Sequence, residues 1–276
     1  MTNYLDFELT SPIGENFDLI KNTQKLVHVP KPEMFESPSS WLSRLALSQG
    51  IEICEAMKYL KINQNGDADI QFVKADIMNI GAKCGIPKQH FSFMCHMFSQ
   101  LVTINSFGTN LLLSYQGSPR YRYCPKCLDE QLNAHFPVHW RFLAWRWCPL
   151  HQRLLNDDCS TCRSPIILPN SLINAGLNEE GVASLNRCLS CGTKLSTPAA
   201  DSFLEEKHRM LSVQDHLLLK NGRALLSTLY HGYFCMGKIP YRFPLPVVNA
   251  LVVAGNIPNR PMHYENVNSI WEQEYE

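Results

Sequence analysis

The sequence lacks a surplus of charge of either sign. Its 276 residues include 25 lysines and arginines and 25 aspartates and glutamates, so the formal net charge is zero. A protein that binds DNA on its own usually has a basic surplus, because contacts to phosphate supply most of its affinity. Any contact with nucleic acid must therefore come from a local basic patch or be assisted by a partner.

The sequence also lacks an apolar run long enough to span a membrane. Its first eight residues carry acids where a secretory signal has a basic and then an apolar stretch. We therefore expect a cytoplasmic protein with no membrane partner. In that reducing compartment, the 11 cysteines favour metal binding over disulfides.

Signatures of common enzyme classes are missing as well. We find no Walker loop, no Gly-x-Ser-x-Gly elbow and no kinase-like set of motifs. A zinc deaminase would need His-x-Glu ahead of a Pro-Cys-x-x-Cys run, and the histidines that precede Cys124 lack a glutamate two residues on. We expect a protein that is not an enzyme and has no catalytic residue.

What is present is a folded chain, with a hydrophobic fraction of 45% and a charged fraction of 18%. The fold class that the patterns predict is mainly α with small zinc-ribbon β elements. The expected order is an irregular N-terminal arm (1–34), a helical, helix-turn-helix-like domain (35–105), a tandem zinc-ribbon domain (106–200), and C-terminal helices with an extended tail (201–276).

Two helix–glycine–helix units fill the predicted helical domain. In the first, Ser37, Ser39 and Ser40 offer N-cap oxygens. Pro38 suits the first helical position, and Gly50 suits a left-handed C-cap. The second unit has one apolar stripe. Glycines interrupt it, and a further helix is expected to begin at Pro87. The stripe comprises Ile70, Val73, Ile77 and Ile80, and the glycines are Gly81 and Gly85.

Two units of this kind have two interpretations. They are compatible with a helix-turn-helix that reads DNA. The favoured interpretation is two helical hairpins that share a core, since most helical hairpins bind nothing.

Two consecutive pairs of metal knuckles follow the helices. Zinc binds four donors in a tetrahedron, and each Cys-x-x-Cys or Cys-x-x-His turn supplies two of them. Because side chains fill all four positions, we expect two structural Zn²⁺ ions and no catalytic one. His135 or His139 could replace a ligand at the first site, although the knuckle pattern favours His151. The first set is Cys124, Cys127, Cys148 and His151, and the second is Cys159, Cys162, Cys188 and Cys191.

Basic and aromatic residues alternate around the first set. Arginine beside aromatic rings suits phosphate contact and base stacking, and it also suits a protein-binding hot spot. The alternative is that the tryptophans form a core around the metal and the arginines are simply solvated. Between residues 118 and 153 the only acids are Asp129 and Glu130. The basic residues are Arg120, Arg122, Lys126, Arg141, Arg146 and Arg153, and the aromatic ones are Tyr121, Tyr123, Trp140, Trp145 and Trp147.

Several motifs together resemble the TniQ family, which includes the related target selector TnsD. The resemblance extends from about residue 36 to 192, and the region after Cys191 matches nothing that we can identify. Pro38 stands where the family has an aliphatic residue. The motifs are the segment 36–46 (ESPSSWLSRLA), the segment 123–128 (YCPKCL), Trp140-Arg-Phe, Cys148-Pro-Leu-His151, Leu154-Leu155 and Cys159-x-x-Cys162.

The resemblance implies a non-catalytic subunit that selects the target of a transposition system. Such proteins either recognise target DNA directly or dock on a CRISPR effector of the Cascade type with its guide RNA. They then recruit the AAA+ ATPase regulator TnsC, which brings the transposase. A homodimer is one further arrangement to test. The alternatives are a zinc-containing helix-turn-helix regulator that binds DNA, and a zinc-stabilised assembly module without a nucleic-acid role.

Overall fold

The first described helix, α2 (Pro38–Gln49), begins where its capping residues predict. Ser37 has extended backbone, with φ −78° and ψ 153°, and its hydroxyl accepts a hydrogen bond from the Ser40 N–H. Pro38 occupies the first turn, where its missing N–H costs nothing. Gly50 ends the helix with a left-handed φ of 63°. The prediction of this helix is confirmed from cap to cap.

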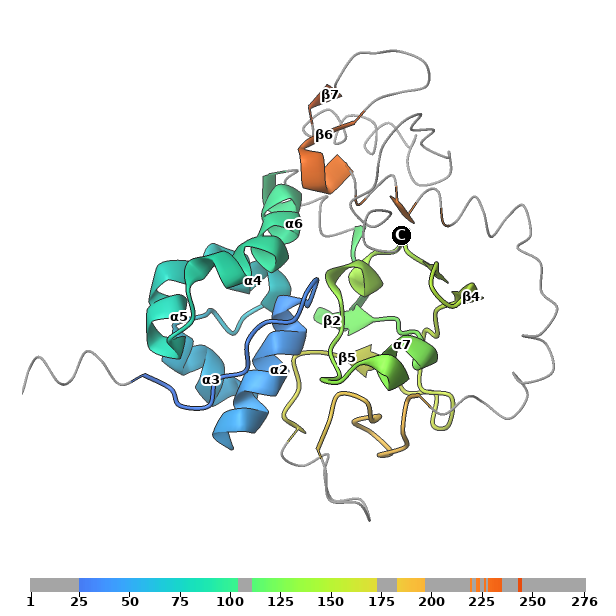
Figure 1. Ribbon diagram of the computed structural model, residues 1–276, viewed down its shortest axis with the longest axis horizontal. Coiled ribbons are helices and arrows are strands. Elements are labelled where there is room, and N and C mark those ends of the chain that lie inside the picture. Colours follow the sequence, from blue (N-terminus) through green and yellow to red (C-terminus); the bar gives the residue numbers. More distant parts are fainter. Residues whose placement is uncertain are drawn as a thin grey trace, which may run out of the picture.

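The other helices of this layer are shown with α2 in Figure 1, which is a computed structural model of the chain. The structure describes residues 25–103, 111–172 and 183–196, and positions 219, 222–223, 226, 228–234 and 243–244. The expectations for residues 1–24 and for most of 201–276 fall outside these residues. The helices that follow α2 are α3 (Ile53–Leu60), α4 (Ala68–Lys74), α5 (Ile77–Cys84), the 3₁₀ helix η1 (Lys88–Phe91) and α6 (Ser92–Thr103).

The apolar stripe of the second unit, expected on one helix, is divided between α4 and α5. Asp76 interrupts the helix, because its carboxylate accepts hydrogen bonds from the Met78 and Asn79 N–H groups and so caps a new helix. Pro87 precedes a 3₁₀ turn and only then the α-helix α6. A helix-turn-helix arrangement stays a prediction.

Trp41 is the centre of the helical core. Its side chain is fully buried, and its ring meets Phe72 and Phe91 edge-on, with centroids 5.7 and 5.1 Å apart. Its indole N–H donates to the Pro30 carbonyl oxygen at 2.9 Å. The lead segment, defined here as residues 25–36, is therefore attached to α2, and it includes residues 25–34 of the predicted irregular arm.

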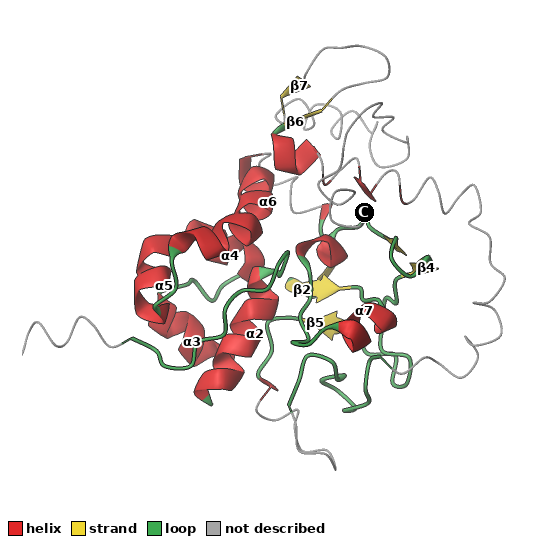
Figure 2. Cartoon of the chain, viewed as in Figure 1, coloured by secondary structure: helices red, strands yellow, loops and turns green. Residues whose placement is uncertain are grey.

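Short strands and turns make up most of the described chain beyond α6, as Figure 2 shows. Gln116 and Gly117 have φ of 50° and 80°, which suits a tight hairpin turn between β1 and β2. The described chain is mainly helical with few small strands, as predicted. One antiparallel sheet has the order β1 (Ser114–Tyr115), β2 (Ser118–Tyr121), β5 (Ile166–Ile167), and two-stranded sheets pair β3 (Trp147–Cys148) with β4 (Arg153–Leu154) and β6 (Tyr233–Phe234) with β7 (Phe243–Pro244).

The helical layer and the strand region share one hydrophobic core. Backbone hydrogen bonds join them at the start of α2, from Ser37 N–H to the Phe136 oxygen at 2.9 Å and from Val138 N–H to the Phe35 oxygen at 2.7 Å. Two short helices complete this side, α7 (Pro125–Glu130) and the 3₁₀ helix η3 (Val138–Arg141). None of the described helices has the length and apolar character to cross a membrane.

Candidate metal centres

The structure brings each predicted set of four ligands together. Within each set, the candidate ligand atoms lie within 4.8 Å of one another. At the first centre the histidine is His151, as the knuckle pattern predicts. His135 instead has its Nδ1 2.9 Å from the Asn133 carbonyl oxygen, and His139 packs its ring against Trp145 with centroids 5.0 Å apart.

The first centre joins two different local structures. Cys124 is the N-cap of α7 and Cys127 lies in its first turn, so the Pro125 that follows Cys124 starts the helix and sets the knuckle. Cys148 ends β3, and His151 lies in the turn that leads to β4. A helical turn and a hairpin thus each contribute two donors.

The donor separations at the first centre fit a tetrahedral ion of the size of zinc. His151 Nδ1 lies 3.3 Å from Cys127 Sγ, 3.5 Å from Cys124 Sγ and 3.6 Å from Cys148 Sγ. Ideal tetrahedral zinc would place sulfur and nitrogen donors about 3.6 Å apart and two sulfurs about 3.8 Å apart. The outer nitrogen, Nε2, lies 2.9 Å from a Glu130 oxygen, a contact that fixes the ring orientation.

The second centre is built from two similar turns. Cys159 Sγ lies 3.7 Å from Cys191 Sγ, and Cys162 Sγ lies 3.6 Å from Cys188 Sγ. Gly192, predicted to permit the turn after the last ligand, has a φ of 74° and donates its N–H to the Cys188 oxygen at 2.8 Å. Both centres fit zinc in donor chemistry and spacing.

Four protein donors at each centre determine what it can do. A tetrahedral ion held by them has no position left for water or substrate. The arrangement therefore suits bracing the fold, with each ion joining segments that lie more than 20 residues apart along the chain, such as Cys124 and Cys148.

Three of the six basic residues expected to form a binding patch point into the protein. Arg141 is fully buried, pairs with Asp67 and Asp69, and donates from Nε to the Leu113 oxygen at 2.8 Å. Arg141 therefore cannot contact a phosphate, and the expectation of a surface role for it is wrong. Its partners lie on and just before α4, more than 70 residues earlier in the chain, so the count of local acids missed them.

Arg122 and Arg120 are held by acids just beyond the patch. The Arg122 side chain is 8% exposed and donates to Asp157 at 2.8 Å and to the Leu143 oxygen at 3.0 Å. Arg120 pairs with Asp158 at 2.9 Å. These contacts brace the turn that leads into the second metal centre, which is an internal role.

The other three basic residues are more accessible. Lys126 and Arg146 are exposed and Arg153 is half-buried, so their use by a partner stays a prediction. The aromatic residues of the same stretch are core residues. Each of Tyr121, Tyr123, Trp140, Trp145 and Trp147 is at most 2% exposed.

A buried polar network that the sequence did not reveal connects the metal region to the helices. Tyr121 donates its hydroxyl to Asp69 at 2.6 Å, and Asp69 accepts the Ser39 N–H at 2.8 Å through its other oxygen. Ser43 accepts the Asn170 N–H at 3.0 Å. The serines of α2 therefore link the two regions, a role beyond the capping expected of them.

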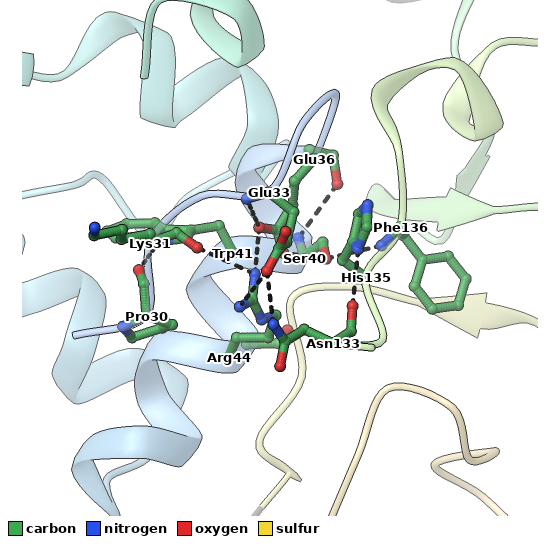
Figure 3. A network of polar contacts seen from close by, with 12 residues as sticks. Pro30, Lys31, Glu33, Glu36, Ser40, Trp41, Arg44, Asn133, His135 and Phe136 are labelled. Atoms are coloured by element: carbon green, nitrogen blue, oxygen red, sulfur yellow. Dashed lines mark hydrogen bonds and ion pairs between the residues drawn. The ribbon is translucent and has the colours of Figure 1, made fainter. Parts of the chain in front are cut away.

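Glu36 is the centre of a second network, drawn in Figure 3. Its carboxylate is fully buried and accepts hydrogen bonds from the Ser40 hydroxyl at 2.8 Å, the Glu33 N–H at 2.9 Å and the Arg44 guanidinium at 2.6 Å. Ser40 in turn accepts the Phe136 N–H at 3.0 Å. Burial raises the pKa of Glu36 to about 7, against the opposing charge of Arg44.

Comparison with known protein families gives a match to TniQ over residues 27–155. The matched range includes almost all of the lead segment, the helical layer and all four ligands of the first metal centre. It begins before the resemblance that the motifs indicated and ends before the second centre. No curated protein matches the chain.

Proposed function

Residues 27–155 of this chain belong to the TniQ family, and from that membership we propose that the chain is a non-catalytic target-selection adaptor of a transposition system. The observation that carries the proposal is the family match itself. The adaptor links a target-DNA complex, either DNA read directly or a Cascade-type CRISPR effector with its guide RNA, to the AAA+ regulator TnsC and so to the transposase.

The site chemistry supports a scaffold rather than a catalyst. Two structural Zn²⁺ ions would be held by clusters that the structure brings together, one of Cys124, Cys127, Cys148 and His151 and one of Cys159, Cys162, Cys188 and Cys191. When bound, zinc ties distant segments together and supplies no reactive position, because the chain provides all four donors. His151 is oriented by Glu130, so the first centre is set by both α7 and the β3–β4 hairpin.

Internal pairing of the arginines favours an adaptor over an autonomous DNA reader. Arg141 pairs with the buried Asp69 and Arg122 pairs with Asp157, so the zinc region offers phosphate less positive charge than its sequence indicated. Because the whole chain is also neutral, tight binding to DNA requires a partner to supply affinity.

The test is a pull-down of the tagged, zinc-loaded chain from cells that carry its native genomic neighbourhood, with and without nuclease. We expect recovery of an AAA+ ATPase with a CRISPR complex and guide RNA, or of the ATPase with DNA alone if the target is read directly. Recovery of DNA without the ATPase would favour a helix-turn-helix regulator. Recovery of other proteins that stay bound after nuclease treatment would favour an assembly module.

A further inference from the structure

A pocket of about 220 Å³ opens beside the first metal centre. Its floor includes Trp140 and Trp145, which are each 2% exposed. Its walls come from three separate segments, so the pocket exists only when the lead segment and both knuckles are in place. The wall residues that matter here are Met34 and Phe35 of the lead segment, Glu130 and Gln131 at the end of α7, and Pro149 and Leu150 of the second knuckle.

The size and rim of the pocket favour a side chain over a cofactor. Sites for small molecules typically measure about 300–1,000 Å³, so this pocket is small for a nucleotide or a cofactor. Met34 is 69% exposed and Leu150 is 49% exposed, which places two large apolar side chains in solvent at its edge. Apolar residues around an aromatic floor are typical of the anchor sites at which one protein holds another.

The charge around the pocket is negative. Its described lining residues include no lysine or arginine, and Glu130 at the rim is 66% exposed. Cys127 and Cys148 also contribute to the wall. His139 adds no positive charge at neutral pH, because burial lowers its pKa to about 3. The exposed Glu130 carboxylate, with no lysine or arginine in the described lining, favours a cation over a phosphate at the rim.

We propose that this pocket is a docking site for a segment of a partner protein that presents a leucine or aromatic side chain next to a lysine or arginine. The apolar side chain lies over Trp140 and Trp145, between Met34 and Leu150. The neighbouring cation pairs with Glu130 at the rim. The inference depends only on the pocket and not on the transposition role.

The probe is a library of random dodecapeptides displayed on phage, selected on the full zinc-loaded chain. Peptides that enrich are synthesised with a fluorophore, and their binding is measured by fluorescence anisotropy. We expect enriched peptides to share an apolar residue beside Lys or Arg. Met34→Glu and Leu150→Glu should each weaken their binding at least tenfold, while Met78→Glu, at a residue 61% exposed on α5 that does not line the pocket, should leave binding unchanged.

Two measurements keep the test decisive. Two zinc ions per chain in each variant would show that the knuckles still fold, which matters most for Leu150→Glu beside a ligand. Three outcomes would each overturn the proposal. They are no enrichment, enriched peptides that lack the expected pair, and peptide binding by both pocket variants that equals binding by wild type. A labelled single-stranded oligothymidine that binds wild type and loses affinity in both variants would assign the pocket to nucleic acid instead. Because the test uses the purified chain alone, its failure leaves the proposed adaptor role standing.

Discussion

Replacing Arg141 by methionine removes the buried cation that pairs with Asp67 and Asp69. Asp69 is fully buried and the Asp67 side chain is 19% exposed, so neither can regain a full water shell. Breaking a buried pair by removing one partner typically costs about 3–5 kcal/mol. We expect Arg141→Met to lower the free energy of unfolding by about that amount, which is a large share of the stability of a domain.

The assay is urea unfolding followed by tryptophan fluorescence, with zinc held at a fixed free concentration. Arg146→Met is the matched control, since Arg146 is exposed and its loss should change stability by no more than about 0.5 kcal/mol. The double variant Asp69→Asn with Arg141→Met removes the more deeply buried of the two stranded charges and should regain at least half of the loss. If Arg141→Met were as stable as the control, Arg141 would be a solvated residue and the internal network would be wrong.

Three further changes follow from the same structure. Cys162→Ser should lower the zinc content from two ions per chain to about one by mass spectrometry, because it removes one of four donors at the second centre. Burial raises the pKa of Glu36 from 4.5 to about 7, so between these values the folded chain keeps a proton that the unfolded chain releases. The stability that this group contributes is therefore lost as the pH rises to about 7. Relative to wild type, Glu36→Gln should therefore gain about 2–3 kcal/mol of unfolding free energy between pH 5 and pH 8 in denaturation curves, and a constant difference would contradict the raised pKa. Gly81→Ala would place a Cβ atom 2.7 Å from the Ile86 oxygen and should cost about 1–3 kcal/mol by the same measurement.

Features set by neighbouring residues could be predicted from the sequence. The cap of α2 depends on Ser37 and Pro38, and each metal knuckle depends on residues three apart. Such patterns carry their own geometry, because a cap or a Cys-x-x-Cys turn needs no information from the rest of the chain. The division of α4 from α5 was also readable in principle, since Asp76 is a strong capping residue within an apolar stripe.

Features that join distant segments could not be predicted in the same way. The partners of Arg141 lie 72 and 74 residues away, so a count of acids in its own stretch indicated a free cation. Ser40 was predicted only as a capping residue, and nothing local shows that its hydroxyl also accepts the Phe136 N–H. The pocket likewise needs the lead segment and both knuckles at once.

The first metal centre and the helical layer act as one unit by this reasoning. Phe136 lies between Tyr121 and Trp140, with ring centroids 5.8 and 5.5 Å away, and its N–H is bonded to Ser40 of α2. An ion that fixes α7 against the β3–β4 hairpin therefore also positions the segment that α2 contacts. The second centre is tied to the same unit, because β2 pairs with β5 and the buried Cys159 and Cys188 belong to the same hydrophobic core as Trp41.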